Sequence, residues 1–123
     1  MQFASIRIAT CDVDRLARFY ERLTGRTAVR PAPVFAALSF GAVQLAISDE
    51  KLIRQFNAGI VSAGANKGAI VEFEVADVDA ARDQLDAAVE IVMEPADMPW
   101  GNRSMLLRDP DGNAVNVFSR PKS

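Results

Sequence analysis

The short motif Asp-Val-Asp occurs twice in this chain, at residues 12–14 and at 77–79, and similar patterns surround each copy. An alternating run of apolar and polar residues precedes each motif, at 5–9 and at 70–75, as in a half-buried strand. Apolar residues at helical spacing follow each motif, and short apolar runs come after the helix. The sequence therefore predicts a β-α-β-β-β unit that is repeated once.

In the first repeat, Asp12 is the expected N-cap of a helix, and Gly25 is the expected stop. Leu16, Phe19 and Leu23 lie at helical spacing between them. The strands expected after this helix lie around 27–29, 35–40 and 43–47.

In the second repeat, Asp77 is the expected N-cap, and Val78, Ala81 and Leu85 share one face of the helix. The strands expected after it lie at 90–93, 104–107 and 114–118. The turn Asp-Pro-Asp-Gly-Asn at 109–113 joins the last two strands into a hairpin.

The expected fold class is α+β, with two tandem β-α-β-β-β modules at about 1–48 and about 69–119. Between them, at about 49–68, Leu52, Ile53 and Phe56 indicate a short helix before a glycine-rich joint. Modules this small bury little surface alone, so residues 1–123 are expected to form a single domain.

The composition excludes several classes of function. The chain has 123 residues, half of them apolar, and a net charge of −2, which predicts no nucleic-acid partner and no anionic membrane partner. The chain lacks histidine, the commonest general base and transition-metal ligand. Cys11 is the single cysteine and cannot form an internal disulfide; a buried or idle thiol is expected there. No leader pattern and no run of ~20 apolar residues is found, so a cytoplasmic protein is expected.

Strand parity predicts which side chains face away from the helices. Helices pack on the apolar face of their strands, so the core side is expected to hold Ile6, Ile8, Val43, Leu45, Ile47, Val71, Phe73, Val75, Val115 and Val117. The opposite faces are expected to hold Ser5, Arg7, Ala9, Gln44, Ala46, Ile70, Glu72, Glu74, Asn116 and Phe118. This mixture of polar and apolar residues is typical of a small-molecule site.

The sequence resembles the vicinal oxygen chelate superfamily of glyoxalase I, extradiol dioxygenases and bleomycin-resistance proteins. Three segments carry the resemblance, in order: IRIATCDVDRLARFYERLTG, VEFEVADVDAARDQL and PWGNRSMLLRDPDGNAVNVF. The resemblance covers nearly the whole chain and implies a cup-shaped mixed sheet with its helices outside. It also implies a homodimer, since the family usually builds its cups from modules of two chains.

Metal-binding members of this family place one ligand, mainly histidine or glutamate, on each of four strands. The matching positions here are Ser5, Gln44, Ile70 and Asn116. This set offers no imidazole, thiolate or carboxylate, so the resemblance implies no metal and no cofactor.

The ligand-binding residues expected on this basis are Ser5, Arg7, Gln44, Ile70, Glu72, Glu74, Trp100, Asn116 and Phe118. Simpler roles are open for several of them. Glu72 and Glu74 either attract a cation or lie solvated, or paired with Arg7. Arg7 clamps a carboxylate or pairs with a neighbouring strand. Trp100 stacks on a ligand or covers a core edge or a dimer contact, and Phe118 lines a pocket or fills the core.

Three functions follow as hypotheses. The first is a metal-free small-molecule binding protein, similar to drug-sequestering resistance proteins and without a catalytic residue. The second is a glyoxalase-like metal-dependent lyase, isomerase or dioxygenase, with a site rebuilt around Glu72 or Glu74. The third is an accessory domain without a ligand. The residues at the family positions favour the first.

Overall fold

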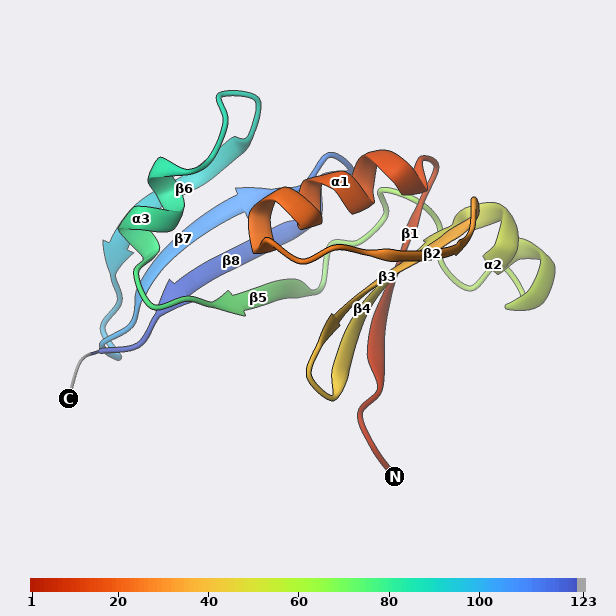
Figure 1. Ribbon diagram of the computed structural model, residues 1–123, viewed down its shortest axis with the longest axis horizontal. Coiled ribbons are helices and arrows are strands. Elements are labelled where there is room, and N and C mark those ends of the chain that lie inside the picture. The colour runs from red at the N-terminus through yellow and green to blue at the C-terminus, as the bar shows by residue number, and fades with distance from the viewer. Residues whose placement is uncertain (122–123) are drawn as a thin grey trace. The chain divides into compact units, whose positions relative to one another are not determined.

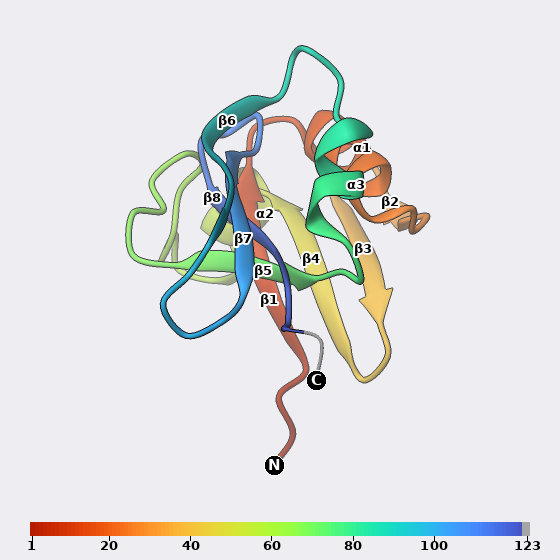
Figure 2. The ribbon, with the colours of Figure 1, turned by 90° about the vertical axis from the view of Figure 1, so that its left-hand side faces the viewer.

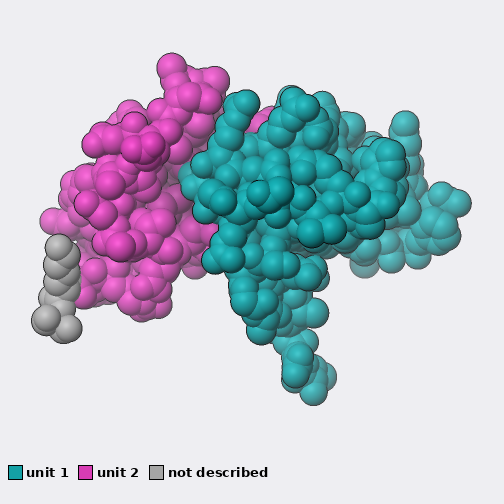
Figure 3. Space-filling view, viewed as in Figure 1, with its two compact units in different colours: residues 1–65 teal, residues 66–123 magenta. Residues whose placement is uncertain are grey.

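The computed structural model describes residues 1–121 and contains two compact units, Met1–Ala65 and Asn66–Ser123 (Figure 3). Each unit holds one β-α-β-β-β module, as the repeated motif predicts. Both are α+β, with an open four-stranded mixed sheet and short helices.

The first unit consists of β1 (Ser5–Thr10), α1 (Val13–Thr24), β2 (Val29–Ala32), β3 (Phe35–Phe40), β4 (Val43–Asp49) and α2 (Glu50–Phe56). Its sheet has the order β1-β4-β3-β2, in which β1 and β4 are parallel and the other pairs antiparallel. Figure 2 shows β1, β4 and β3 side by side.

The second unit consists of β5 (Ile70–Glu74), α3 (Val78–Asp83), β6 (Glu90–Asp97), β7 (Arg103–Arg108) and β8 (Ala114–Ser119). Its order, β5-β8-β7-β6, repeats that of the first sheet, with a parallel β5–β8 pair and two antiparallel pairs. The two halves therefore have the same topology as well as the same motif.

The repeated aspartates begin the two helices in the same way. The carboxylate of Asp12 accepts a hydrogen bond from the backbone N–H of Arg15 at 3.0 Å, and that of Asp77 accepts one from Ala80 at 3.1 Å. Each satisfies an N–H that has no partner inside the helix. Gly25 ends α1 in the left-handed conformation, with φ of 73°. These predictions are confirmed.

The two helices of the first unit lie on opposite faces of its sheet (Figure 1). Helix α1 packs on β3 and β4, whereas α2 packs on β4 and β1. The buried core includes Leu16, Tyr20 and Ile47, all fully inaccessible. Ala9 and Ala46, expected on the face away from α1, are also buried. Helix α2 therefore covers part of that face.

The prediction that Ile6 and Val43 belong to the core is wrong, because their exposed fractions are 48% and 37%. Ile6 lies on the edge strand β1, and Val43 is the first residue of β4. Helix α1 lies over β3 and β4, so the edge of the sheet at β1 stays uncovered. The alternation of the strands predicts which face of the sheet these residues lie on, but it does not predict how far helix α1 extends over that face.

Helix α3 is shorter than α1 and shorter than the spacing of Leu85 predicts. It ends at Asp83 with Gln84 as its C-cap, and the carboxylate of Asp86 then accepts a hydrogen bond from the backbone N–H of Ala88 at 2.8 Å. An aspartate in this position favours a turn over another helical residue. Arg103 on β7 holds the helix to the sheet through Asp79, at 2.8 Å.

Two strands differ from their expected positions. Strand β2 lies at Val29–Ala32 instead of 27–29, and β6 extends to Asp97. Both contain a proline, Pro31 and Pro95, and both have irregular register with their neighbours. Proline is tolerated there because each is an edge strand, where an N–H is not needed for pairing.

The turn between β7 and β8 is built around a buried carboxylate. One oxygen of Asp109 accepts hydrogen bonds from the backbone N–H groups of Asp111 and Asn113, each at 2.9 Å. The other accepts one from the Asn113 amide at 2.7 Å. The side-chain amide of Asn66, before β5, donates to the side-chain oxygen Oδ1 of Asn113 at 3.3 Å, so the turn also anchors the start of this unit.

The core of the second unit lies between α3 and the β7–β8 pair. Met105, Leu107, Val115 and Val117 are buried, as the alternation of their strands predicts, and Val78 of α3 is 1% exposed. Within residues 1–121, every helix is too short or too polar to cross a membrane.

Candidate functional site

The four positions that match the family's metal ligands lie on β1, β4, β5 and β8. In the first unit, Ser5 and Gln44 are register partners on the parallel strands β1 and β4. In the second unit, Asn116 is the register partner of Glu72, while Ile70 lies opposite Ala114. The structure thus brings Ser5 to Gln44, and Asn116 to Glu72.

The side chains at these positions do not fit a transition metal. Gln44 donates its amide to the hydroxyl of Ser39 at 3.5 Å, and Asn116 donates its amide to the carboxylate of Glu72 at 2.8 Å. Ile70 has no donor atom. Within residues 1–121, no group of three or more His, Cys, Asp or Glu side chains could hold a metal ion. We therefore derive no metal chemistry from this donor set.

Arg7 has a partner that the sequence did not indicate. Its guanidinium donates to the side-chain carbonyl of Asn57 at 3.0 Å. Asn57 follows the last residue of α2, so this bond ties the sheet to the linker helix. Arg7 remains exposed, and its charge is not neutralised by this neutral partner.

Glu72 and Glu74 lie on the same strand but have different partners. Glu74 forms an ion pair with Arg120 at 3.0 Å, and the Arg120 guanidinium lies 5.6 Å from the centre of the Phe118 ring. Among residues 1–121, the partner of Glu72 is the neutral amide of Asn116, which donates to its carboxylate at 2.8 Å. The two carboxylates are therefore not equivalent, and Phe118 already has a cation over its ring.

Trp100 lies in the turn that joins β6 to β7, and 69% of its surface is exposed. The turn is closed by a backbone hydrogen bond from Met98 to Asn102 at 2.7 Å. A Cβ atom on Gly101 would lie 3.3 Å from Pro121, so the turn is next to the end of β8 (Figure 1). Trp100 does not fill the core of its unit, because most of its side chain is exposed.

Sequence reasoning missed Ser39, Asn57 and Arg120 as partners of the candidate residues. Ser39 could have been found, because the two-residue turn after Phe40 fixes its pairing with Gln44. Asn57 and Arg120 could not, since their contacts depend on the path of a linker and of the chain end.

The carboxylates whose pKa is shifted lie away from these candidate residues. Hydrogen bonds from Arg30 and from the backbone of Ala28 hold the pKa of Glu21 below its usual range. Arg103 lowers the pKa of Asp79, and Arg82 lowers that of Glu94. These pairs join helices to neighbouring strands, so they indicate structural roles.

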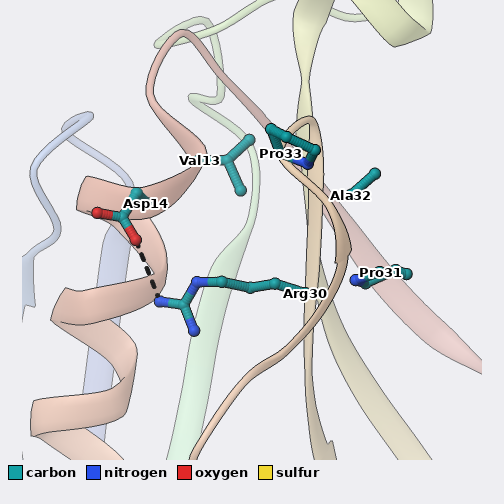
Figure 4. A pocket seen from close by; sticks show the side chains of 6 residues that line it. All are labelled: Val13, Asp14, Arg30, Pro31, Ala32 and Pro33. Atoms are coloured by element: carbon teal, nitrogen blue, oxygen red, sulfur yellow. Dashed lines mark ion pairs between the residues drawn. The ribbon is translucent and has the colours of Figure 1, made fainter.

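A hollow of about 460 Å³ lies between α1 and β2 (Figure 4). Arg30 crosses it, 3.4 Å from Asp14 and 2.9 Å from Glu21. The charge of this arginine is thus already balanced by two carboxylates. Its lining residues are Val13, Asp14, Arg30, Pro31, Ala32 and Pro33.

Two open-sheet modules with a repeated β-α-β-β-β order define the vicinal oxygen chelate type of fold. A family model described as the Glyoxalase/Bleomycin resistance protein/Dioxygenase superfamily matches residues 2–117. The chain belongs to this superfamily.

Solved structures give the same result for the fold. A glyoxalase/bleomycin resistance protein/dioxygenase from Nocardioides has a TM-score of 0.81 at 25% identity, covering 100% of this chain and 85% of its own. A protein of unknown function from Agrobacterium tumefaciens str. C58 has a TM-score of 0.82 at 26% identity, and the match covers 97% of this chain and 94% of that protein. A glyoxalase-related enzyme from Fulvimarina pelagi has a TM-score of 0.83 at 19% identity, and the match covers 98% of this chain and 88% of that protein. At this identity the similarity supports the fold alone. No curated protein matches the chain.

Proposed function

We propose that this protein is a metal-free small-molecule binding protein of its superfamily, which holds a planar aromatic compound on the open faces of its sheets. The observation that carries the proposal is the neutral set Ser5, Gln44, Ile70 and Asn116 at the positions of the family's metal ligands. Such residues bind and orient a ligand through hydrogen bonds and apolar contact, and they supply no reactive group.

The side chains around these positions support this proposal. Ser5, Gln44 and Glu72 are exposed, and they present hydroxyl, amide and carboxylate groups on strands rather than on loops. Trp100 adds an exposed aromatic ring on a closed turn. Each sheet therefore presents polar groups on a rigid frame, and the second unit adds an aromatic ring, which suits flat ligands with few donors and acceptors.

A ligand-stabilisation screen tests the proposal. Planar aromatic compounds should raise the melting temperature of the purified protein by several degrees when present at about 100 times Kd, because they bind only the folded state. Trp100→Ala should weaken binding of any hit by about 1–3 kcal/mol, the scale of one aromatic contact. If no planar compound stabilises the protein, the accessory-domain hypothesis replaces this one.

The metal-dependent alternative has a separate test. Protein purified without chelators should contain far less than one zinc, nickel, iron or manganese per chain, and glutathione-dependent glyoxalase activity should be undetectable. Elemental analysis that finds about one metal per chain would overturn the metal-free proposal, and Glu72→Gln would then show whether Glu72 is a ligand.

A further inference from the structure

We propose that Glu72 is the residue that selects ligand charge on the second sheet, and that Asn116 is the positioning residue that holds its carboxylate. The class of ligand that follows is a planar cation. This inference rests on the proposed function, since it names the ligand class for the same sheet face.

The charge of Glu72 is not balanced by a cation. Its carboxylate is exposed, and its interaction partner in residues 1–121 is the amide of Asn116 at 2.8 Å. An amide donor orients a carboxylate without cancelling its charge. A full negative charge therefore remains on this face.

Glu74 provides an internal contrast on the same strand. Arg120 pairs with it at 3.0 Å, and the same guanidinium lies over Phe118. A ligand cation near Glu74 would have to displace Arg120 from both contacts. In the described part of the chain no cation pairs with Glu72, so a ligand cation would bind there without displacing one of these side chains.

The position of Asn116 fixes the direction of its amide. Asn116 and Glu72 are register partners on the parallel strands β8 and β5, so their side chains share one face. The reversed amide would place Oδ1 against a carboxylate oxygen, with two acceptors in contact. In the observed direction Oδ1 is buried without a hydrogen-bond partner. The amide thus satisfies Glu72 and leaves its own carbonyl unsatisfied.

The neighbours of this pair explain why the cation should be flat and largely apolar. Leu106 on β7 is the register partner of Asn116 and is half-buried. Ile70 precedes Glu72 by two residues on the same face and is 56% exposed. An aromatic ring can lie against these alkyl side chains while its positive charge faces the free oxygen of Glu72.

The test compares two probes that share one flat ring system and differ in charge and in one N-methyl group. N-methylacridinium carries a permanent positive charge, and acridine is its neutral counterpart at pH 7.5. The wild-type protein should bind the cation about fivefold more tightly at low salt, on the scale of one partly exposed ion pair, and the preference should shrink as ionic strength rises. Isothermal titration gives the ratio of the two Kd values.

Variants at three positions separate the roles. Glu72→Gln keeps an acceptor for Asn116 and should bring the ratio close to one. Glu74→Gln is the matched control and should leave the ratio nearly unchanged. Asn116→Val should lower the ratio by weakening the cation more than acridine, because the variant removes the amide that orients Glu72. The unfolding midpoint checks that the variant is folded, and Asn116→Thr is the second variant if the first unfolds.

Each outcome decides the inference. If wild type binds both probes equally, or if Glu74→Gln lowers the ratio as much as Glu72→Gln, Glu72 does not select charge, although acridine binding would still support the proposed function. An unchanged ratio in both Asn116 variants would overturn the positioning role. Binding of neither probe to wild type would overturn both proposals.

Discussion

Ala58 is the non-glycine residue with positive φ in the described part of the chain, at 56°. It follows α2 and Asn57, where the chain turns away from the helix. A left-handed conformation is unfavourable for alanine because its Cβ approaches the following carbonyl, whereas glycine has no such contact.

Ala58→Gly should therefore stabilise the protein by about 0.5 kcal/mol, since relief of this strain outweighs the greater freedom of glycine in the unfolded chain. Urea unfolding measures the change. Gly25→Ala is the control: its φ is 73°, and no atom lies within 4 Å of the added Cβ. It should lose about 1 kcal/mol from conformation alone. A lower midpoint for Ala58→Gly would contradict the assignment of strain.

For single residues, the sequence predicts which face of a sheet a side chain lies on better than it predicts the side chain's hydrogen-bond or ion-pair partner. Alternation placed Asn116 and Glu72 away from the core, and the structure pairs them. It could not tell Glu72 from Glu74, because their difference depends on where Arg120 lies after β8. Arg7 illustrates the same limit, since Asn57 is distant in sequence and reaches it only through the path of α2.

At the scale of elements, the β7–β8 turn combines a local signal with a longer-range role. The sequence Asp-Pro-Asp-Gly-Asn predicts the turn, and Gly112 adopts φ of 84° within it. The buried carboxylate of Asp109 accepts hydrogen bonds from the backbone and side chain of Asn113. The side chain of Asn113 in turn accepts a hydrogen bond from Asn66. The Asp-Pro-Asp-Gly-Asn turn therefore joins β7 to β8 and also holds the segment before β5 through Asn66.

Asp109→Ala should destabilise the protein by about 3 kcal/mol, because it leaves the N–H groups of Asp111 and Asn113 and the Asn113 amide without their acceptor. Denaturant unfolding measures the loss. Asp86→Ala is a matched control, since its carboxylate caps an exposed turn after α3, and it should lose less than about 1 kcal/mol. Equal losses would mean that the buried network adds nothing beyond turn formation.

Most elements could be predicted, and the differences have identifiable causes. β3 begins and ends where its apolar run does, at Phe35 and Phe40. The predicted position of β2 is too early in the chain, and the predicted β6 is too short. Both strands contain a proline, Pro31 or Pro95, and proline in a single sequence argues against a strand. Whether a strand lies at an edge, and so tolerates proline, is a property of the sheet and not of the segment.

At the scale of the whole molecule, acid should unfold the protein through its paired carboxylates. Hydrogen bonds lower the pKa of Glu21, Glu50, Asp79 and Glu94 in the folded state. The unfolded chain then binds more protons at low pH, so stability rises with pH through this range. Their contribution is complete above the unfolded values of about 4–4.5 and is lost as pH falls through the lower folded values.

Urea midpoints should therefore fall progressively below about pH 4.5, while they should stay nearly constant between about pH 6 and 8, because the chain has no histidine. Arg103→Met should remove part of the acid-dependent loss by releasing Asp79. A stability that does not change between pH 5 and 3 would show that these pairs contribute nothing measurable.

We also expect the protein to be a homodimer, as the family resemblance implies. Large apolar side chains are strongly exposed in the single chain, among them Val29, Phe56 and Ile60, at 67%, 68% and 79%. Exposed apolar surface of this kind is typical of association surfaces. Sedimentation at micromolar concentration should give twice the mass of one chain, and the mass of a single chain would contradict the expectation.

Each sheet takes all four of its strands from one half of the chain, and both sheets use the same order. An ancestor of half the length would thus have contained every strand pairing that either half now uses. The pairings inside one sheet therefore place no demand on the residues of the other sheet. Positions that correspond in the two topologies, such as Ser5 and Ile70, can carry different chemistry without a change of register in either half.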